Sequence, residues 1–173
     1  MAFPEHYLDA AKRAFGDATE SIETVALRAP TLFDRPAIVW EGDAQTFAFT
    51  YVSKSAESVL GHPAKRWITE ATFWVDAVVH PDDREDAVAY CALATGQCLD
   101  HAFVYRGQTA DGRTLWLADY VQVIRGPRGV ADRLRGIMID ITNDLPQKDD
   151  GTKAWRSPTR HSLEGLRSPQ NPT

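Results

Sequence analysis

Apolar residues in the first thirty positions recur at steps of three and four. Tyr7, Ala11, Phe15, Ile22 and Val25 follow this spacing, which places them on one stripe of a helix. The pattern predicts a single N-terminal amphipathic helix within residues 1–30.

Five later stretches are rich in the β-branched and aromatic residues that favour extended strands. Gly42 and Asp43 separate the first two stretches and predict a β-hairpin. Asp111 and Gly112 favour a turn between the third and fourth stretches, and residues 126–132 connect the fourth to the fifth. The predicted strands cover residues 37–41, 46–52, 99–106, 114–125 and 134–142.

The segment between the second and third strands favours helices. Gly61 and Pro63 interrupt residues 53–80, which predicts several short buried helices in place of one long one. Pro81 suits the first position of a helix that runs to about Ala94, because its missing amide donor is not needed there.

Strands that cluster at both ends of this order do not form the alternating repeat of a parallel sheet. We therefore expect an α+β fold with an antiparallel sheet and the helices on one of its faces. A chain of 173 residues with 43% hydrophobic residues can bury one core. We assign that core to residues 37–143 and expect residues 144–173, which prolines and glycine interrupt, to be a disordered tail.

Charge and cysteine usage narrow the function classes. The net charge of −5 gives no long-range attraction for phosphate backbones, so we expect no nucleic-acid partner. Charged residues interrupt every hydrophobic run before the ~18 residues of a membrane span, so we expect no membrane partner either. Cys91 and Cys98, with no leading signal segment, favour free thiols in a reducing compartment, and the cytoplasm fits best.

Four ordered motifs in residues 37–143 resemble the PAS domain, in the subtype with a tryptophan in the fourth strand that is common in bacterial sensor proteins. They are Val59-Leu60-Gly61, then His80-Pro81-Asp82-Asp83-Arg84, then Tyr105-Arg106 followed by Asp111-Gly112 and Trp116, and finally Gly136 before Asp140-Ile141-Thr142.

The resemblance implies a five-stranded antiparallel sheet that cups a small cavity beneath the short helices. The family uses such cavities for cofactors or metabolites, or fills them with side chains, and its domains sense, dimerise and relay signals. Candidate cavity residues are Trp40, Phe73, Trp74, Phe103, Tyr105, Trp116, Tyr120, Ile137 and Ile139. Plain core packing is the alternative for each of these residues.

The motif residues also have structural interpretations. His80 and Asp83 are expected to accept hydrogen bonds from free amides at the helix start, and Gly112 to support a turn with positive φ. Asp140 and Thr142 could fasten the last strand to the following segment. The resemblance implies in addition that Asp140 and Thr142 relay a change in the cavity to that segment.

The cofactor cannot be named from the sequence. The flavin-binding light sensors of the superfamily carry a reactive cysteine before the long helix, and residues 61–79 contain none, so flavin-adduct chemistry is disfavoured. Haem-binding members place a histidine within the long helix, and residues 82–94 contain none, which leaves only an unusual ligand such as His101. Cysteine and histidine spacings fit no zinc set, so no metal is predicted.

No phosphate loop, nucleophile elbow or zinc-protease helix occurs in the chain, so we predict that it is not an enzyme. The leading hypothesis is a non-catalytic sensory module whose N-terminal helix forms a homodimer, because its stripe is longer than one sheet is expected to cover. A separate kinase or regulator would receive the signal. The alternatives are a tight cofactor- or metabolite-binding sensor and, less favoured, a small-molecule enzyme with a site of His80, Asp82, Asp83 and His101.

Overall fold

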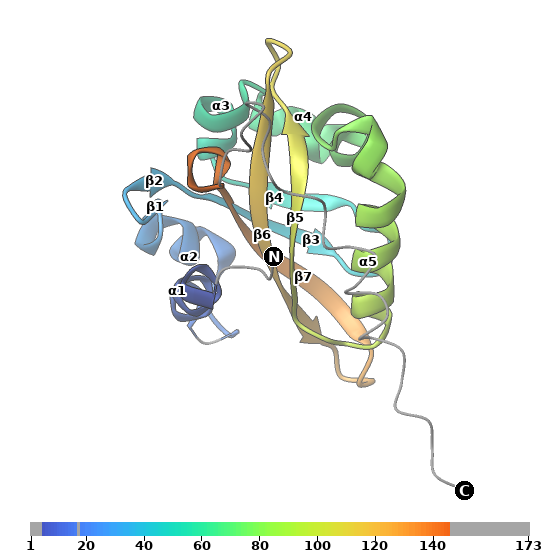
Figure 1. Cartoon of the computed structure of the whole chain (residues 1–173). Helices are drawn as coiled ribbons and strands as arrows, with labels where there is room; N and C mark the ends of the chain where they lie inside the picture. Colours follow the sequence, from blue (N-terminus) through green and yellow to red (C-terminus); the bar gives the residue numbers. More distant parts are fainter. Residues whose placement is uncertain (1–4, 17, 146–173) are drawn as a thin grey trace, which may run out of the picture.

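A computed structural model describes residues 5–16 and 18–145 (Figure 1). Its centre is an antiparallel sheet of five strands in the order β4-β3-β7-β6-β5. The strands are β3 (Ile38–Asp43), β4 (Phe49–Val52), β5 (His101–Gln108), β6 (Thr114–Arg125) and β7 (Ala131–Asp140). The predicted α+β class and the five strands are confirmed, with shifts of a few residues at the strand ends.

The short helices cover one face of this sheet, which we call the inner face. They are α3 (Ser55–Leu60), α4 (Ala64–Thr69), the π-helical turn η1 (Trp74–Val78), the 3₁₀ turn η2 (Pro81–Asp83) and α5 (Arg84–Gly96). Their apolar side chains pack with those of the inner face into the larger of two hydrophobic clusters. The predicted break near Gly61 and the helix beginning at Pro81 are both observed.

The hairpin of β3 and β4 forms as predicted, but its turn lies further along the chain. One carboxylate oxygen of Asp43 accepts hydrogen bonds from the backbone N–H groups of Gln45 and Thr46 and from the Thr46 hydroxyl. This local bonding favours a turn after an aspartate. Gly42 is therefore part of β3 and not of the turn.

The N-terminal stretch forms two helices, α1 (Glu5–Phe15) and α2 (Ile22–Arg28), so the prediction of a single helix is wrong. Ser21 caps α2 by accepting a hydrogen bond from the N–H of Thr24. Arg28 donates to the carbonyl of Ala14 at 2.7 Å and holds the corner between the two helices. The stripe of apolar residues is thus shared by two short helices, each of which packs its apolar side chains against the sheet.

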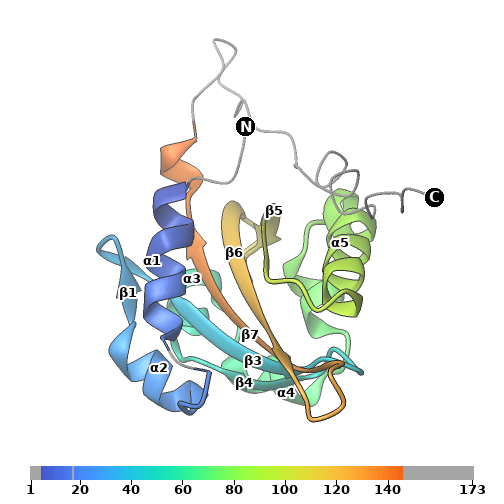
Figure 2. The same ribbon diagram turned by 90° about the horizontal axis from the view of Figure 1, so that it is seen from below.

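Both N-terminal helices pack on the outer face of the sheet, opposite the short helices (Figure 2). Phe15 and Val25 are fully buried there against Val39, Ala118 and Ile139. The chain's own sheet therefore covers the stripe, and the premise of the predicted homodimer, a stripe too long for one sheet, is wrong.

Two further small elements flank the sheet. The predicted connector between Pro30 and Pro36 contains a short hairpin of β1 (Thr31–Leu32) and β2 (Arg35–Pro36). After β7 the chain enters the 3₁₀ turn η3 (Thr142–Asp144). The predicted tail lies outside the described residues apart from its first two positions. Among the described helices, none is both long enough and apolar enough to cross a membrane.

Candidate ligand-binding cavity and C-terminal exit

A cavity of about 210 Å³ lies between the inner face of the sheet, the β3–β4 hairpin, η1 and α5. Most of its walls are apolar or aromatic. Its lining side chains include Trp40, Phe47, Phe49, Trp74, Val88, Cys91, Ala92, Phe103, Asp119, Val121, Leu134 and Met138.

Exposed residues from three separate segments border this cavity. Thr46 and Phe47 belong to the hairpin turn, Thr72 precedes η1, and Val88 and Ala92 lie on successive turns of α5. The deeper walls, in contrast, belong to buried residues of the sheet. The cavity therefore has a mouth at the surface and a closed inner end.

The position of the Trp40 indole depends on a glycine in the neighbouring strand. Trp40 of β3 is directly opposite Gly136 of β7. A Cβ atom at position 136 would lie 1.9 Å from the indole Cε2, far inside any permitted contact. Position 136 of the sequence motif therefore needs a glycine, because the indole ring crosses β7 at this point.

Asp119 of β6 contributes a buried carboxyl group to the cavity wall and is only 1% exposed. The Trp40 indole N–H donates to one of its oxygens at 3.2 Å, and the Tyr105 hydroxyl donates to the other at 3.3 Å. Burial disfavours the charged form more than these two neutral donors favour it, and raises the pKa of Asp119 to about 8. The free protein therefore holds this group largely protonated at neutral pH.

Tyr105 connects Asp119 to the helical side of the cavity. Its hydroxyl accepts a hydrogen bond from the Trp74 indole at 3.0 Å and lies 3.4 Å from the sulfur of Met138. Burial, together with the nearby Asp119, raises the pKa of Tyr105 well above its usual value. Trp74, Tyr105, Asp119 and Trp40 consequently form one chain of polar contacts from η1 through the sheet to β3.

Cys91 is buried in α5 and lines the cavity. Burial, with the Asp119 carboxyl nearby, raises the pKa of this thiol to about 12, so it stays protonated and is a poor nucleophile. Within the described ranges, no three His, Cys, Asp or Glu side chains gather in an arrangement that could hold a metal ion.

The structure divides the predicted cavity residues into three groups. Trp40, Trp74 and Phe103 line the cavity. Phe73 and Tyr105 belong to the same inner core but do not line it.

Four predicted cavity residues lie on the opposite face of the sheet, so their assignment to the cavity is wrong. Tyr120, Ile137 and Ile139 are buried beneath the N-terminal helices, and Trp116 packs at the edge of that cluster. Strand alternation correctly groups Ile137 with Ile139, but alternation alone does not say which face is inward. Because of the same uncertainty, the sequence does not identify Met138 and Asp119 as cavity residues, although both line the cavity.

The motif at the start of the long helix has a structural role. His80 behaves as predicted, whereas Asp83 does not. His80 accepts a hydrogen bond from the N–H of Asp82 at 3.2 Å, as expected. Asp83 does not cap the helix; it accepts from the backbone N–H of Arg106 at 2.9 Å and from its guanidinium at 2.6 Å. The carboxylate thus ties the helix start to β5. Gly112 has φ of +86°, as predicted for its turn.

The four residues of the less favoured enzyme alternative do not come together in one site. His80, Asp82 and Asp83 lie together beside Arg106. His101 is five positions from Arg106 along β5, which corresponds to ~17 Å in a strand. Its ring packs against Tyr90 and Phe103 and does not line the cavity.

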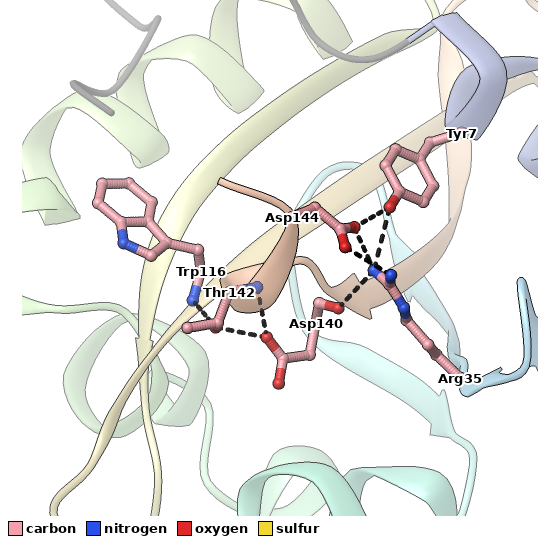
Figure 3. A network of polar contacts seen from close by, with 6 residues as sticks. All are labelled: Tyr7, Arg35, Trp116, Asp140, Thr142 and Asp144. Carbon is pink, nitrogen blue, oxygen red and sulfur yellow. Dashed lines mark hydrogen bonds and ion pairs between the residues drawn. The ribbon is translucent and has the colours of Figure 1, made fainter. Parts of the chain in front are cut away.

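The end of β7 is fastened to β6 through Asp140 and Thr142 (Figure 3). The Thr142 hydroxyl accepts a hydrogen bond from the backbone N–H of Trp116 at 2.8 Å and donates to Asp140. Asp140 also accepts from the N–H of Thr142 at 2.9 Å. These bonds set the direction in which the chain leaves the sheet.

Sequence reasoning missed a second set of contacts at this exit, which joins it to the N-terminal region (Figure 3). Arg35 of β2 forms an ion pair with Asp144, with one nitrogen to oxygen distance of 2.6 Å, and donates to the carbonyl of Asp140 at 3.2 Å. Tyr7 of α1 donates its hydroxyl hydrogen to Asp144 and accepts from Arg35 at 3.0 Å. No sequence motif links these three side chains, because they come from three distant segments.

Comparison with known proteins agrees with this geometry. The sequence profile of a family described as the PAS fold matches residues 49–138. A search of curated proteins finds no significant match.

Several solved structures share the fold. The N-terminal domain of a diguanylate cyclase with a PAS/PAC sensor from Marinobacter aquaeolei is 34% identical, covers 62% of this chain and 97% of its own, and has a TM-score of 0.58. A sensory box histidine kinase/response regulator from Burkholderia thailandensis is 20% identical, covers 86% of this chain and 93% of its own, and has a TM-score of 0.53. A PAS domain from Colwellia psychrerythraea is 19% identical, covers 62% of this chain and 87% of its own, and has a TM-score of 0.52.

Proposed function

This chain belongs to the PAS fold family, and on that premise we propose that it is a non-catalytic sensory module that binds a small molecule in the inner cavity and relays its presence through the exit of β7. A solved structure with 34% identity is the N-terminal domain of a diguanylate cyclase with a PAS/PAC sensor, which supports a sensory role.

The observation that carries the proposal is the open cavity itself. Its volume of about 210 Å³ exceeds the ~150 Å³ of an engineered apolar cavity that takes up benzene. Apolar walls with a few polar groups are typical of small-molecule sites. The alternative, a domain filled by its own side chains, has less support because Trp40, Trp74 and Phe103 surround this space and do not fill it.

Strand β7 supports a relay from the cavity to the exit. Met138 of this strand lines the cavity, and Asp140 lies two positions further along the same strand. A ligand that shifts β7 would change the contacts of Asp140 and Thr142 with Trp116 and those of Asp144 with Arg35. We therefore propose that Asp140 and Thr142 relay the signal, together with Arg35.

The receiver of the signal is proposed from the relatives. The relatives named above include a cyclase and a histidine kinase, so a kinase, cyclase or regulator is the expected receiver. Homodimerisation stays a prediction. The exposed Leu27 of α2, and not the buried stripe, is the apolar side chain that α2 offers to a second copy.

Native mass spectrometry of the freshly purified protein tests the proposal, with a denatured sample for comparison. A mass that is lost on denaturation supports a sensor with a bound molecule, and the native spectrum also gives the oligomeric state. An unliganded dimer would favour the protein-interaction alternative.

Two variants on α5 localise any bound molecule. Ala92→Phe places a ring at the cavity mouth and is expected to abolish binding, whereas Ala89→Phe adds the same ring to an exposed position that does not line the cavity. Equal ligand retention in both variants would contradict the assignment of binding to this cavity.

A further inference from the structure

The described lining of the cavity contains acidic groups but no basic group. Its lining residues include two carboxyl groups, Asp43 and Asp119, and among the described residues no lysine, arginine or histidine lines it. Asp43 lies in the hairpin, where hydrogen bonds from Thr46 and Gln45 lower the pKa of its carboxyl. A site with acidic groups and no base favours cations over anions.

The walls reinforce this preference. The lining includes the aromatic side chains of Trp40, Phe47, Phe49, Trp74 and Phe103. The faces of such rings attract ammonium groups, and tryptophan does so most strongly. Trp40 and Trp74 come from opposite sides of the cavity, β3 and η1, so a cation between them would meet both ring systems.

Asp119 lacks a cationic partner within the described part of the chain, where no ion pair includes it. Its two hydrogen-bond donors, Trp40 and Tyr105, are neutral and their bonds are long, at 3.2 and 3.3 Å. A carboxylate can accept about four hydrogen bonds, so further donors can be accommodated. Once Asp119 is ionised, an ammonium group supplies both further donors and the opposite charge.

We propose that this cavity binds a small organic ammonium ion, a protonated amine on one aromatic ring or a short alkyl chain, with its charge against Asp119 and the rings of Trp40 and Trp74. The proposal rests on the proposed function and gives the ligand its chemical class. The cavity volume of about 210 Å³ suits a single ring with a short side chain, because ~150 Å³ holds benzene.

The proton balance of binding gives a distinctive readout. Since the pKa of Asp119 is raised to about 8, the free carboxyl is protonated at neutral pH. It must release one proton to the buffer when an ammonium ion, whose own pKa is ~10, binds beside it. Affinity should therefore rise about tenfold for each pH unit up to about pH 8.

Other groups that face Asp119 do not titrate in this range. Tyr105 of β5 and Cys91 of α5 both have raised pKa values, so both stay neutral. Trp40 of β3, Trp74 of η1 and Met138 of β7 carry no titratable group. A pH dependence of binding can therefore be assigned to Asp119.

The test is isothermal titration calorimetry with three probes of similar shape: 2-phenylethylamine, 2-phenylethanol and 3-phenylpropanoate. We expect the amine to bind at least about tenfold more tightly than the alcohol, and the acid not to bind. Asp119→Asn should weaken binding of the amine by a similar factor and affect binding of the alcohol far less. Titration of the wild-type protein in buffers of different ionisation enthalpy measures the proton release and needs no variant.

The possible outcomes distinguish failure of the ammonium ligand from failure of the proposed function. Equal binding of alcohol and amine, or amine binding without proton release, overturns the ammonium ligand but leaves a small-molecule cavity. Failure of all three probes overturns the ammonium ligand too, and with no co-purifying mass in the native spectrum it also removes the support for the proposed function.

Discussion

Arg35 and Asp144 are 109 positions apart in the sequence, and their side chains form an ion pair that joins the N-terminal region to the exit of β7. Their side chains are 32% and 29% exposed, so solvent screens the pair only in part. The same guanidinium also bonds to Tyr7 and to the carbonyl of Asp140. One residue therefore holds together the two segments that flank the sheet.

Replacing Arg35 should loosen the N-terminal region more than the sheet. Arg35→Gln is expected to lower the free energy of unfolding by about 1–2 kcal/mol, because it removes charged hydrogen bonds from a partly buried site. Hydrogen exchange should accelerate most in α1 and η3. Urea unfolding and exchange mass spectrometry measure the two effects.

The matched control is Arg113→Gln, which breaks the exposed ion pair of Arg113 with Asp111 in the turn between β5 and β6. Exposed pairs of this kind contribute only about 0.2–1 kcal/mol. An equal loss of unfolding free energy in both variants, or unchanged hydrogen exchange in α1, would show that Arg35 does not join the two segments.

The close approach of Trp40 to Gly136 predicts a large effect of a single methyl group. Gly136→Ala would place a Cβ about 2 Å from three atoms of the indole ring, and a buried ring cannot move as the end of a flexible chain can. We expect a loss of about 3 kcal/mol in the free energy of unfolding, the upper end for overpacked cores.

Gly96→Ala serves as the control because a Cβ at position 96 meets nothing within 4 Å. It should leave stability unchanged or raise it by up to about 1 kcal/mol. Wild-type stability in Gly136→Ala would mean that β3 and β7 separate more easily than the packing around Trp40 indicates.

The sequence pattern predicted the sheet because each strand carries its own local signal. Alternation and turn residues mark β6 and β7 without reference to distant parts of the chain. The same local signals misled at the N-terminus, where a regular apolar spacing runs across Gly16 although the helix ends at Phe15. Spacing reports which residues share a face but not where a helix stops.

The candidate site was only partly predictable for a related reason. Trp40 and Phe103 are aromatic and Ile137 and Ile139 aliphatic, and side chains of both kinds are expected in the wall of a ligand cavity, yet the two pairs lie on opposite faces of the sheet. The face is decided by which segment packs on it, and that is a property of the whole fold. Asp119 was missed because a carboxyl group in an apolar strand looks like a solvent-facing residue.

Asp83 illustrates a motif residue with a testable structural role. Its carboxylate is buried and accepts three hydrogen bonds from Arg106, one from the backbone and two from the guanidinium. Asp83→Ala would leave these donors without their partner, and we expect a loss of about 2–3 kcal/mol in the free energy of unfolding.

The neighbouring Asp82 provides the control. Its side chain is 74% exposed and lies 3.7 Å from the Arg106 guanidinium. Asp82→Ala should change stability by less than about 1 kcal/mol. Chemical denaturation measures both variants. A small loss of unfolding free energy in both would contradict the anchoring role of Asp83.

Asp119 should make the folded protein less stable as the pH rises. The pKa of its carboxyl is raised to about 8 in the folded state, whereas an unfolded aspartate loses its proton near pH ~4. Between these values the folded state binds more protons than the unfolded state, so the free energy of unfolding falls with increasing pH. The stabilising contribution is complete below about pH 4 and is lost by about pH 8, with a slope of up to about 1.4 kcal/mol per unit.

Asp119→Asn keeps the shape of the side chain and removes the titration, so the difference between the two proteins isolates this group. His101, whose pKa burial lowers, contributes a slope of the opposite sign below about pH 6.5, but it is common to both proteins and cancels. We expect the free energy of unfolding of the wild type, measured by urea unfolding between about pH 5 and 8, to fall steadily relative to that of the variant as the pH rises. Parallel curves would mean that the buried carboxyl is already ionised at low pH, and the proton release expected on amine binding would then be lost as well.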